Sequence, residues 1–151
     1  MIAAVGAPRD RALGAAIAEY ETRAARYWPL DVREVREESA RHLAPAAVRD
    51  REGVRLADAV GTAAVVACAE AGDRMTSAEF ARWLQAARES AGRDVAFVIG
   101  GAFGLGDAVL AGASRRLALA PWTLPHELAR LVLAEQLYRA GTIIRGEPYH
   151  K

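Results

Sequence analysis

The sequence predicts an α/β domain with a mainly parallel sheet flanked by helices. Short apolar runs alternate along the chain with stretches whose apolar residues recur at helical spacing. The runs at 62–68 and 95–99 are apolar on both faces, as central strands of a parallel sheet are. The chain has 151 residues, without a repeat or a linker-like segment, so we expect one domain over residues 1–151.

Four elements are expected in the first 60 residues. The apolar run at 2–5 indicates a strand, and apolar spacing predicts a helix between Asp10 and Pro29. Residues 30–35 indicate a second strand, followed by a charged loop, and Pro45 suits the first turn of a helix that reaches Val60. The residues expected to face the core from these helices are Leu13, Ile17, Tyr20, Ala24, Tyr27, Val48, Val60 and either Val54 or Leu56.

The second part of the chain continues the alternation. After the strand at 62–68, residues 69–74 are expected to form a loop. Thr76 and Glu79 form a capping-box pattern at the start of a helix that Gly92 ends. The remaining elements are a strand at 95–99, a glycine-rich loop at 100–106, a short helix at about 107–113, a strand at 116–119 and a helix from about 125 to 140.

Composition limits the classes of function. The formal net charge of +1 does not indicate nucleic-acid binding through bulk charge. The single cysteine, Cys68, cannot form an internal disulfide, which fits a cytoplasmic protein. No secretory signal or membrane-length apolar run is present, and no histidines have metal-ligand spacing. We therefore expect no membrane and no metal as partners.

Three segments follow predicted strands, at 68–72, 100–106 and 119–124. In an open parallel sheet, ligands bind beyond the carboxyl ends of the strands, and glycines let a ligand approach the backbone. The glycine spacing is wrong for a dinucleotide fingerprint, and no P-loop is present. The glycines alone leave open whether these segments hold a cofactor or form ordinary turns.

The C-terminus is unusual because it ends on Pro148-Tyr149-His150-Lys151. Most termini end in loosely ordered residues, so we expect this tail to be placed in a site. For Arg139 the competing interpretation is a surface ion pair with Glu135, four residues earlier. Tyr138 could instead pack in the core or at a dimer interface. His126 could cap the start of a helix or pack there, and the side chain of His150 could simply be exposed to solvent.

Several motifs together resemble one family, the bacterial large-subunit rRNA pseudouridine N3-methyltransferases of the SPOUT superfamily. The resemblance covers essentially the whole chain. It rests on Glu19-Tyr20 with Arg23, Glu52-Gly53, Phe97 to Gly104, and Leu124-Pro125-His126 through Tyr149-His150-Lys151. It implies a C-terminal trefoil knot, S-adenosylmethionine as cofactor, and a homodimer whose site is completed by the partner subunit. It also implies methylation of N3 of a pseudouridine in RNA carried by the ribosome.

The resemblance also implies site residues. Those for the cofactor are Cys68, where the family usually has leucine, with Gly100, Gly101, Gly104, Leu119, Ala120, Pro121, Trp122, Thr123 and Leu124. We hypothesise that Arg139, Tyr149 and His150 surround the target base and that the tail caps the cofactor pocket, with His150 as a proton acceptor. Apolar residues around the last helix favour a dimer, namely Trp122, Leu128, Leu131 and Tyr138. The alternatives are a non-catalytic ribosome-associated factor, a SPOUT methyltransferase acting on tRNA, and a small-molecule enzyme of the same fold class.

Overall fold

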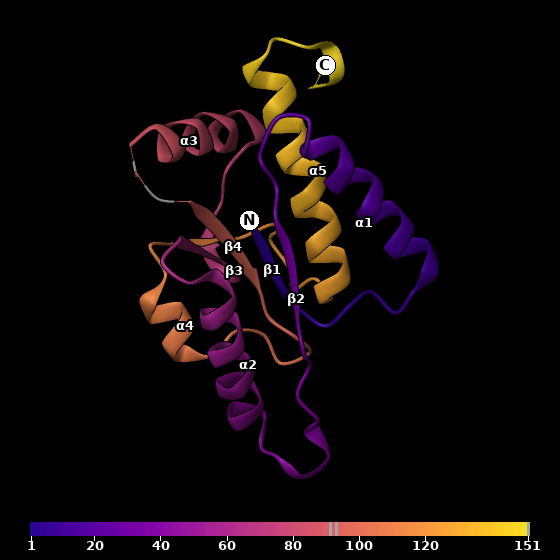
Figure 1. The fold of residues 1–151 in the computed structure, drawn as a ribbon, viewed down its shortest axis with the longest axis vertical. Coiled ribbons are helices and arrows are strands. Elements are labelled where there is room, and N and C mark those ends of the chain that lie inside the picture. The colour runs from indigo at the N-terminus through magenta and orange to yellow at the C-terminus, as the bar shows by residue number, and fades with distance from the viewer. Residues whose placement is uncertain (91, 93, 151) are drawn as a thin grey trace.

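A five-stranded parallel sheet forms the centre of the protein (Figure 1). The computed structural model describes residues 1–90, 92 and 94–150, apart from the side chains of Ser90 and His150. The strand order is β2-β1-β4-β3-β5, and the four pairings between neighbouring strands are parallel. The strands are β1 (Ile2–Val5), β2 (Val32–Val35), β3 (Ala64–Asp73), β4 (Val95–Ile99) and β5 (Arg115–Leu117). The expected parallel α/β fold is confirmed.

The helices cover both faces of the sheet. They are α1 (Arg11–Ala24), α2 (Pro45–Val60), α3 (Ser77–Ser90), α4 (Asp107–Gly112) and α5 (His126–Ile144), with two 3₁₀ turns, η1 (Ala40–His42) and η2 (Pro148–His150). Successive residues of a strand point to opposite faces. Ile2 and Ala4 accordingly join the core under α1, α3 and α5, whereas Ala3 and Val5 join the core under α2 and α4.

Helix ends follow the local signals of the sequence in most places. The side chain of Asp10 accepts from the backbone N of Leu13 at 2.8 Å, which caps α1. Thr76 and Glu79 make the reciprocal bonds of a capping box at the start of α3. α1 ends at Ala24, earlier than Pro29 indicates, because residues 25–28 turn toward α5.

The choice between Val54 and Leu56 on α2 is decided in favour of Leu56. Its side chain is 1% exposed, whereas Val54 is 62% exposed. The same helix also buries Glu52, which the apolar pattern does not reveal.

Two sequence predictions are wrong at the C-terminal half of the sheet. Residues 69–73 continue β3 and do not form a loop, because the chain here lies against β5, where Leu117 pairs with both Cys68 and Asp73. A Cβ at Gly72 would lie 2.6 Å from the backbone of Leu117, so glycine permits this approach. β5 itself ends at Leu117, two residues before the predicted end.

Helix α5 ends four residues later than predicted. The predicted end was at about Ala140, but the helix continues through Gly141 to Ile144. A Cβ at Gly141 would lie 2.6 Å from Cβ of Tyr27, so this glycine serves a close contact with the chain after α1. None of the described helices is long and apolar enough to cross a membrane. The trefoil knot stays a prediction.

Candidate functional site

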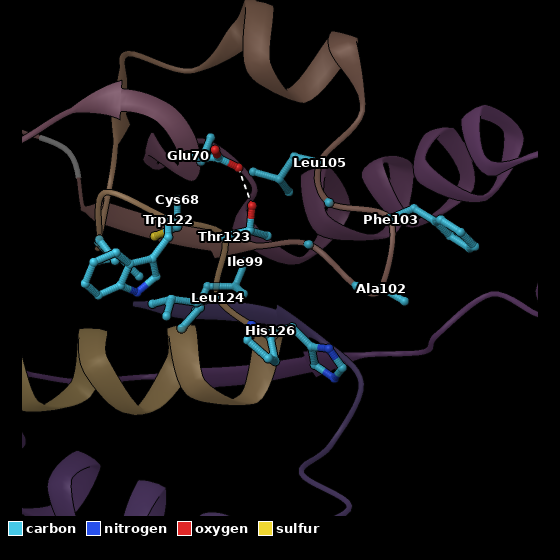
Figure 2. A pocket seen from close by; sticks show the side chains of 18 of the residues that line it. Cys68, Glu70, Ile99, Ala102, Phe103, Leu105, Trp122, Thr123, Leu124 and His126 are labelled. Carbon is cyan, nitrogen blue, oxygen red and sulfur yellow. Dashed lines mark hydrogen bonds between the residues drawn. The ribbon is translucent and has the colours of Figure 1, made fainter.

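A cavity of about 850 Å³ opens where three segments of the chain meet (Figure 2). It has the size of typical small-molecule sites. The three segments are the second half of β3, the glycine-rich loop after β4, and the chain between β5 and α5. Of the residues predicted to bind the cofactor, all except Pro121 line this cavity. Their role in binding stays a prediction, but the structure brings them together.

The glycine-rich loop turns back sharply on itself. A Cβ at Gly100 would lie 2.8 Å from N of Leu105 and closer still to the carbonyl group of Gly104. Gly104 has a φ of +77°, and its N–H donates to the carbonyl of Gly101 at 3.0 Å. Only glycine tolerates this conformation and this approach, so the turn presents bare backbone to the cavity.

The walls of the cavity combine apolar and polar groups. Leu105 and Leu119 contribute apolar surface. The hydroxyl of Thr123 donates a hydrogen bond to the carboxylate of Glu70, which connects the chain between β5 and α5 to β3 (Figure 2). Desolvation raises the pKa of the Cys68 thiol to about 12, so this cysteine is a neutral, unreactive part of the wall. Trp122 is 67% exposed at the rim.

These features fit a methyl donor of the S-adenosylmethionine class. The apolar side chains can pack against a purine ring, while free backbone groups of the glycine turn can bond its polar edge. The residues that would hold the donor are Cys68, the turn from Gly100 to Gly104, and the segment 119–124. No group of acidic, cysteine or histidine side chains in the described part of the chain could hold a metal ion.

Glu52 is a buried acid behind the glycine turn that sequence reasoning did not assign. Its side chain is 2% exposed, and Oε1 accepts from the backbone N of Glu38 at 3.0 Å. Oε2 has no hydrogen-bond partner among the described residues and lies 2.9 Å from where a Cβ at Gly101 would stand. Glu52 therefore backs the turn, and the Glu52-Gly53 motif was the available signal.

His126 lines the cavity at the first residue of α5. His126 does not cap the helix, which was one of its predicted roles. Pro125 is the N-cap residue, and no side chain forms a capping hydrogen bond at this end. One turn further along the helix, Arg130 is buried and bonds Glu21 at 2.8 Å and Glu34 at 2.6 Å, which fixes α5 to α1 and β2.

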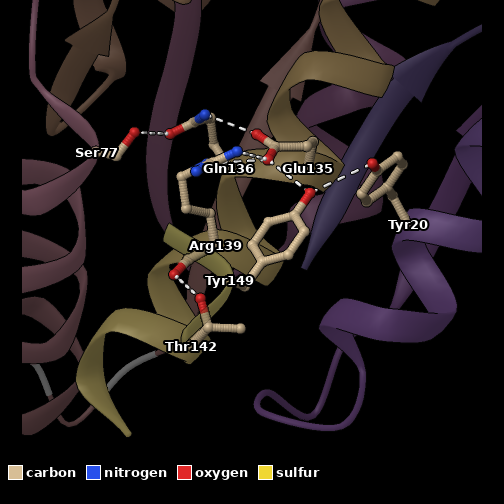
Figure 3. A network of polar contacts seen from close by, with 7 residues as sticks. All are labelled: Tyr20, Ser77, Glu135, Gln136, Arg139, Thr142 and Tyr149. Carbon is tan, nitrogen blue, oxygen red and sulfur yellow. Dashed lines mark hydrogen bonds and ion pairs between the residues drawn. The ribbon is translucent and has the colours of Figure 1, made fainter. Parts of the chain in front are cut away.

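A second polar cluster lies toward the other end of α5 (Figure 3). Oε1 of Glu135 accepts from Nε and Nη2 of Arg139 at 2.9 and 2.7 Å and from the hydroxyl of Tyr149 at 3.2 Å. The Tyr149 hydroxyl also lies 3.3 Å from that of Tyr20 on α1. The ion pair between Glu135 and Arg139 is confirmed, and it forms part of a cluster that includes the tail.

Electrostatics in this cluster keep Tyr149 neutral and Arg139 charged at neutral pH. Desolvation, the hydrogen bond to Tyr20 and the charge of Glu135 raise the pKa of Tyr149. The hydrogen bonds from Arg139 to Glu135 raise the pKa of the guanidinium. Tyr149 is thus a neutral hydroxyl beside a permanently charged Arg139.

The cluster and the cavity are separate within one chain. Arg139 comes thirteen residues after His126 on the same helix, which at 1.5 Å per residue places it about 20 Å further along the axis. The tail lies at that far end of α5 (Figure 1). Within one chain, Pro148 and Tyr149 do not line the cavity, and capping of the cavity by the tail stays a prediction. The side chain of His150 lies outside the described part of the structure.

A known protein family and its relatives match almost the whole length of the chain. The chain matches the family described as "Predicted SPOUT methyltransferase" over residues 1–150. It is 66% identical over 148 residues to the ribosomal RNA large subunit methyltransferase H of Gemmatimonas aurantiaca, an alignment that covers 97% of this chain and 96% of that protein. The protein of the same name from Anaeromyxobacter sp. (strain K) is 47% identical over 156 residues, covering 99% of this chain and 97% of that one.

Solved structures share the fold at low sequence identity. A probable methyltransferase from Bordetella pertussis Tohama I matches with a TM-score of 0.57 at 16% identity and covers 92% of this chain and 94% of its own. TrmJ from Z. mobilis ZM4 matches with a TM-score of 0.51 at 20% identity, covering 92% of this chain and 68% of its own.

Proposed function

Because the chain belongs to the SPOUT methyltransferase family, we propose that it methylates N3 of a pseudouridine in large-subunit ribosomal RNA. It is an S-adenosylmethionine-dependent methyltransferase, and the proposal extends this activity to one base and one atom. The observation that carries the proposal is the convergence of three segments on one cavity, together with the hydrogen bond that holds Tyr149 of the tail on Glu135. We place the enzyme in the cytoplasm, as a single domain over residues 1–151, acting on assembled ribosomal particles.

When bound, the cofactor supplies an activated methyl group, so the protein has to align the base and accept its N3 proton. The imide anion that develops at N3 is stabilised by a nearby cation, a role that suits Arg139. Its guanidinium is held by Glu135, which leaves the remaining N–H groups for the base. His150 follows Tyr149 in the tail, and histidine is the side-chain type that can accept a proton near neutral pH, so it is our candidate for the proton acceptor.

The second part of the proposal is a homodimer in which the tail of one subunit completes the cavity of the other. It is supported by the position of Tyr149 and Arg139 within one chain, where both bond Glu135 and neither lines the cavity. Glu135 lies about 9 Å further along α5 than Ala129, the last residue of the helix that lines the cavity. Trp122 is exposed at the cavity rim, and Leu128 and Leu131 of α5 are only half-buried. These apolar groups give a partner subunit a surface to cover.

Mixed dimers test this arrangement directly. A Gly100→Trp subunit with a blocked cavity, combined with an Arg139→Ala subunit, should regain activity that neither homodimer has. Restoration is expected because one cavity and one tail of each mixed dimer remain intact and face each other. If the mixture stays inactive while wild type and variants sediment as dimers, the tail does not act on the partner; a stable monomer at micromolar concentration contradicts the dimer itself.

The substrate is tested with purified protein and labelled S-adenosylmethionine. Large ribosomal subunits or whole ribosomes from cells lacking the gene should accept methyl groups, and mass spectrometry of digested rRNA should find an N3-methylated pseudouridine. Transfer to tRNA but not to ribosomes identifies a tRNA enzyme. Ribosome binding without any affinity for the cofactor in a calorimetric titration identifies a non-catalytic factor.

A further inference from the structure

A groove of about 360 Å³ lies outside the cofactor cavity, between the chain after α1 and the C-terminal parts of α3 and α5. Two aromatic rings line it, each with an arginine stacked on it. The guanidinium of Arg145 lies 4.7 Å from the centre of the Tyr27 ring. The guanidinium of Arg88 lies 5.0 Å from the centre of the Trp28 ring. Neither pair has a role in the reaction proposed above.

The two rings are held in fixed positions by α5 and the tail. Nε1 of Trp28 donates to the backbone carbonyl of Leu137 at 2.8 Å. The hydroxyl of Tyr27 donates to the carboxylate of Glu147, and its ring packs closely on Gly141, where a Cβ would lie 2.6 Å from Cβ of Tyr27. Because these two rings are already held in place, they lose little further side-chain freedom when a ligand binds to the arginines stacked on them.

The cations of the groove are not neutralised. Arg88, Arg145 and the adjacent Arg26 are exposed, and none of them forms an ion pair with another described residue. Nη2 of Arg145 donates one long hydrogen bond, of 3.4 Å, to the backbone carbonyl of Arg26. Among the described residues that line the groove, Glu89 is the one carboxylate, and it accepts from Gln85 at 3.0 Å. The free N–H edges of these arginines suit an anionic partner with planar groups.

The groove is continuous with the tail cluster. The Tyr27 ring lies 5.8 Å from Tyr138, and Tyr138 lies 4.5 Å from Tyr149, measured between ring centres. A nucleic acid whose base reaches Tyr149 therefore has neighbouring nucleotides within reach of Tyr27 and Trp28. Guanidinium groups stacked on aromatic rings bind bases and phosphates of RNA loops in many proteins.

We infer that this groove, lined by Tyr27, Trp28, Arg88 and Arg145, binds the ribosomal RNA strand beside the target nucleotide. The inference rests on the proposed function, because it takes the tail as the place where the target base lies. Arg88 and Arg145 contact phosphate oxygens or base edges, and the rings beneath them hold the guanidinium planes in place. A local site of this kind explains how a chain with a net charge of only +1 engages RNA.

The test measures equilibrium binding of large ribosomal subunits to fluorescently labelled full-length protein over a range of salt concentrations. An R88Q/R145Q variant is compared with R11Q/R41Q, which removes the same charge from two exposed arginines outside the groove. We expect R88Q/R145Q to weaken binding about tenfold near physiological salt and to lower the salt slope by about 1 to 2. The control should retain the wild-type slope, and both variants should bind S-adenosylmethionine as wild type does.

An R88K/R145K variant separates stacking from charge, since lysine keeps the charge without the planar group. It should recover only part of the lost affinity. Equal affinity and salt slope for R88Q/R145Q and R11Q/R41Q would overturn the groove inference while leaving the proposed methyl transfer intact. Ultraviolet crosslinks from residues 26–28 to a ribosomal protein, and none to rRNA, would also overturn it. A wild-type protein that binds no ribosomal particle contradicts the proposed function itself.

Discussion

The guanidinium of Arg139 lies 4.8 Å from the centre of the Tyr149 ring, and both side chains bond the same oxygen of Glu135. Glu135 thus orders a helix residue and a tail residue as one unit. The carboxylate also connects outward, because its second oxygen accepts from Gln136, whose own carbonyl oxygen accepts from Ser77 on α3 (Figure 3). The position of the tail therefore depends on three elements, α1, α3 and α5.

Replacing Glu135 with glutamine should lower kcat on ribosomes about tenfold and leave the affinity for S-adenosylmethionine unchanged. The neutral amide holds Arg139 less firmly and is a weaker acceptor for Tyr149, so the two groups lose their common orientation. Steady-state kinetics and calorimetry measure the two effects. Asp31→Asn is a matched control, since it removes an acid that pairs with the exposed Arg33, and it should keep wild-type kinetics. A wild-type kcat for Glu135→Gln contradicts the role of this carboxylate.

Deleting Tyr149 to Lys151 should abolish methylation and leave cofactor binding intact. The cavity is lined by residues no later than Ala129, so removal of the tail changes none of its walls. Methyl transfer to ribosomes and calorimetric titration with the cofactor are measured on the same preparation. A truncated protein that methylates ribosomes at the wild-type rate shows that the tail has no part in the reaction.

Gly100→Ala should weaken binding of S-adenosylmethionine at least about tenfold, because the added methyl group collides with the carbonyl of Gly104 and opens the turn. Gly112→Ala is the control: a Cβ there meets nothing within 4 Å, and alanine favours a helix. Titration calorimetry of both variants tests the turn. Unchanged affinity in Gly100→Ala would mean that the shape of the turn does not matter for the cofactor.

Leu56→Ala should reduce the free energy of unfolding by about 2–5 kcal/mol, because it leaves a cavity in the core between α2 and the sheet. Val54→Ala, two residues away on the exposed side of the same helix, should change it by less than about 0.5 kcal/mol. Chemical denaturation of both variants gives the difference. Similar losses for the two variants would contradict the burial assigned to this helix.

Cys68 should make the protein less stable at alkaline pH. Its pKa is raised to about 12 in the folded state, so the unfolded thiol ionises first as the pH rises above about 8.5. The contribution of the neutral thiol is present in full below that pH and is lost as the pH rises toward about 12. Relative to Cys68→Ala, the free energy of unfolding should fall by about 1.4 kcal/mol per pH unit between about 9 and 12. If the free energies of unfolding of the two proteins change with pH by the same amount, the burial of the thiol is refuted.

The sequence by itself determined the kind of each main element and the three segments of the cavity. Apolar runs of the right length gave β1 and β4, since a strand buried on both faces has no polar positions. Local side-chain bonds fixed helix starts at Asp10 and Thr76, because capping needs only residues near in the chain. The residues from Phe97 to Gly104 and the tail residues indicate the family from the sequence alone.

Only the tertiary structure decided features that depend on residues far apart in the chain. β3 continues to Asp73 because β5 lies beside it. α5 continues past Gly141, where the absence of a side chain leaves room for Tyr27. The burial of Glu52 behind Gly101 and the groove beside Trp28 arise in the same way. The distance between the cavity and the tail follows from the length of α5, which a local pattern could not fix. These features come from packing between distant segments, whereas sequence patterns report chiefly what each segment does by itself.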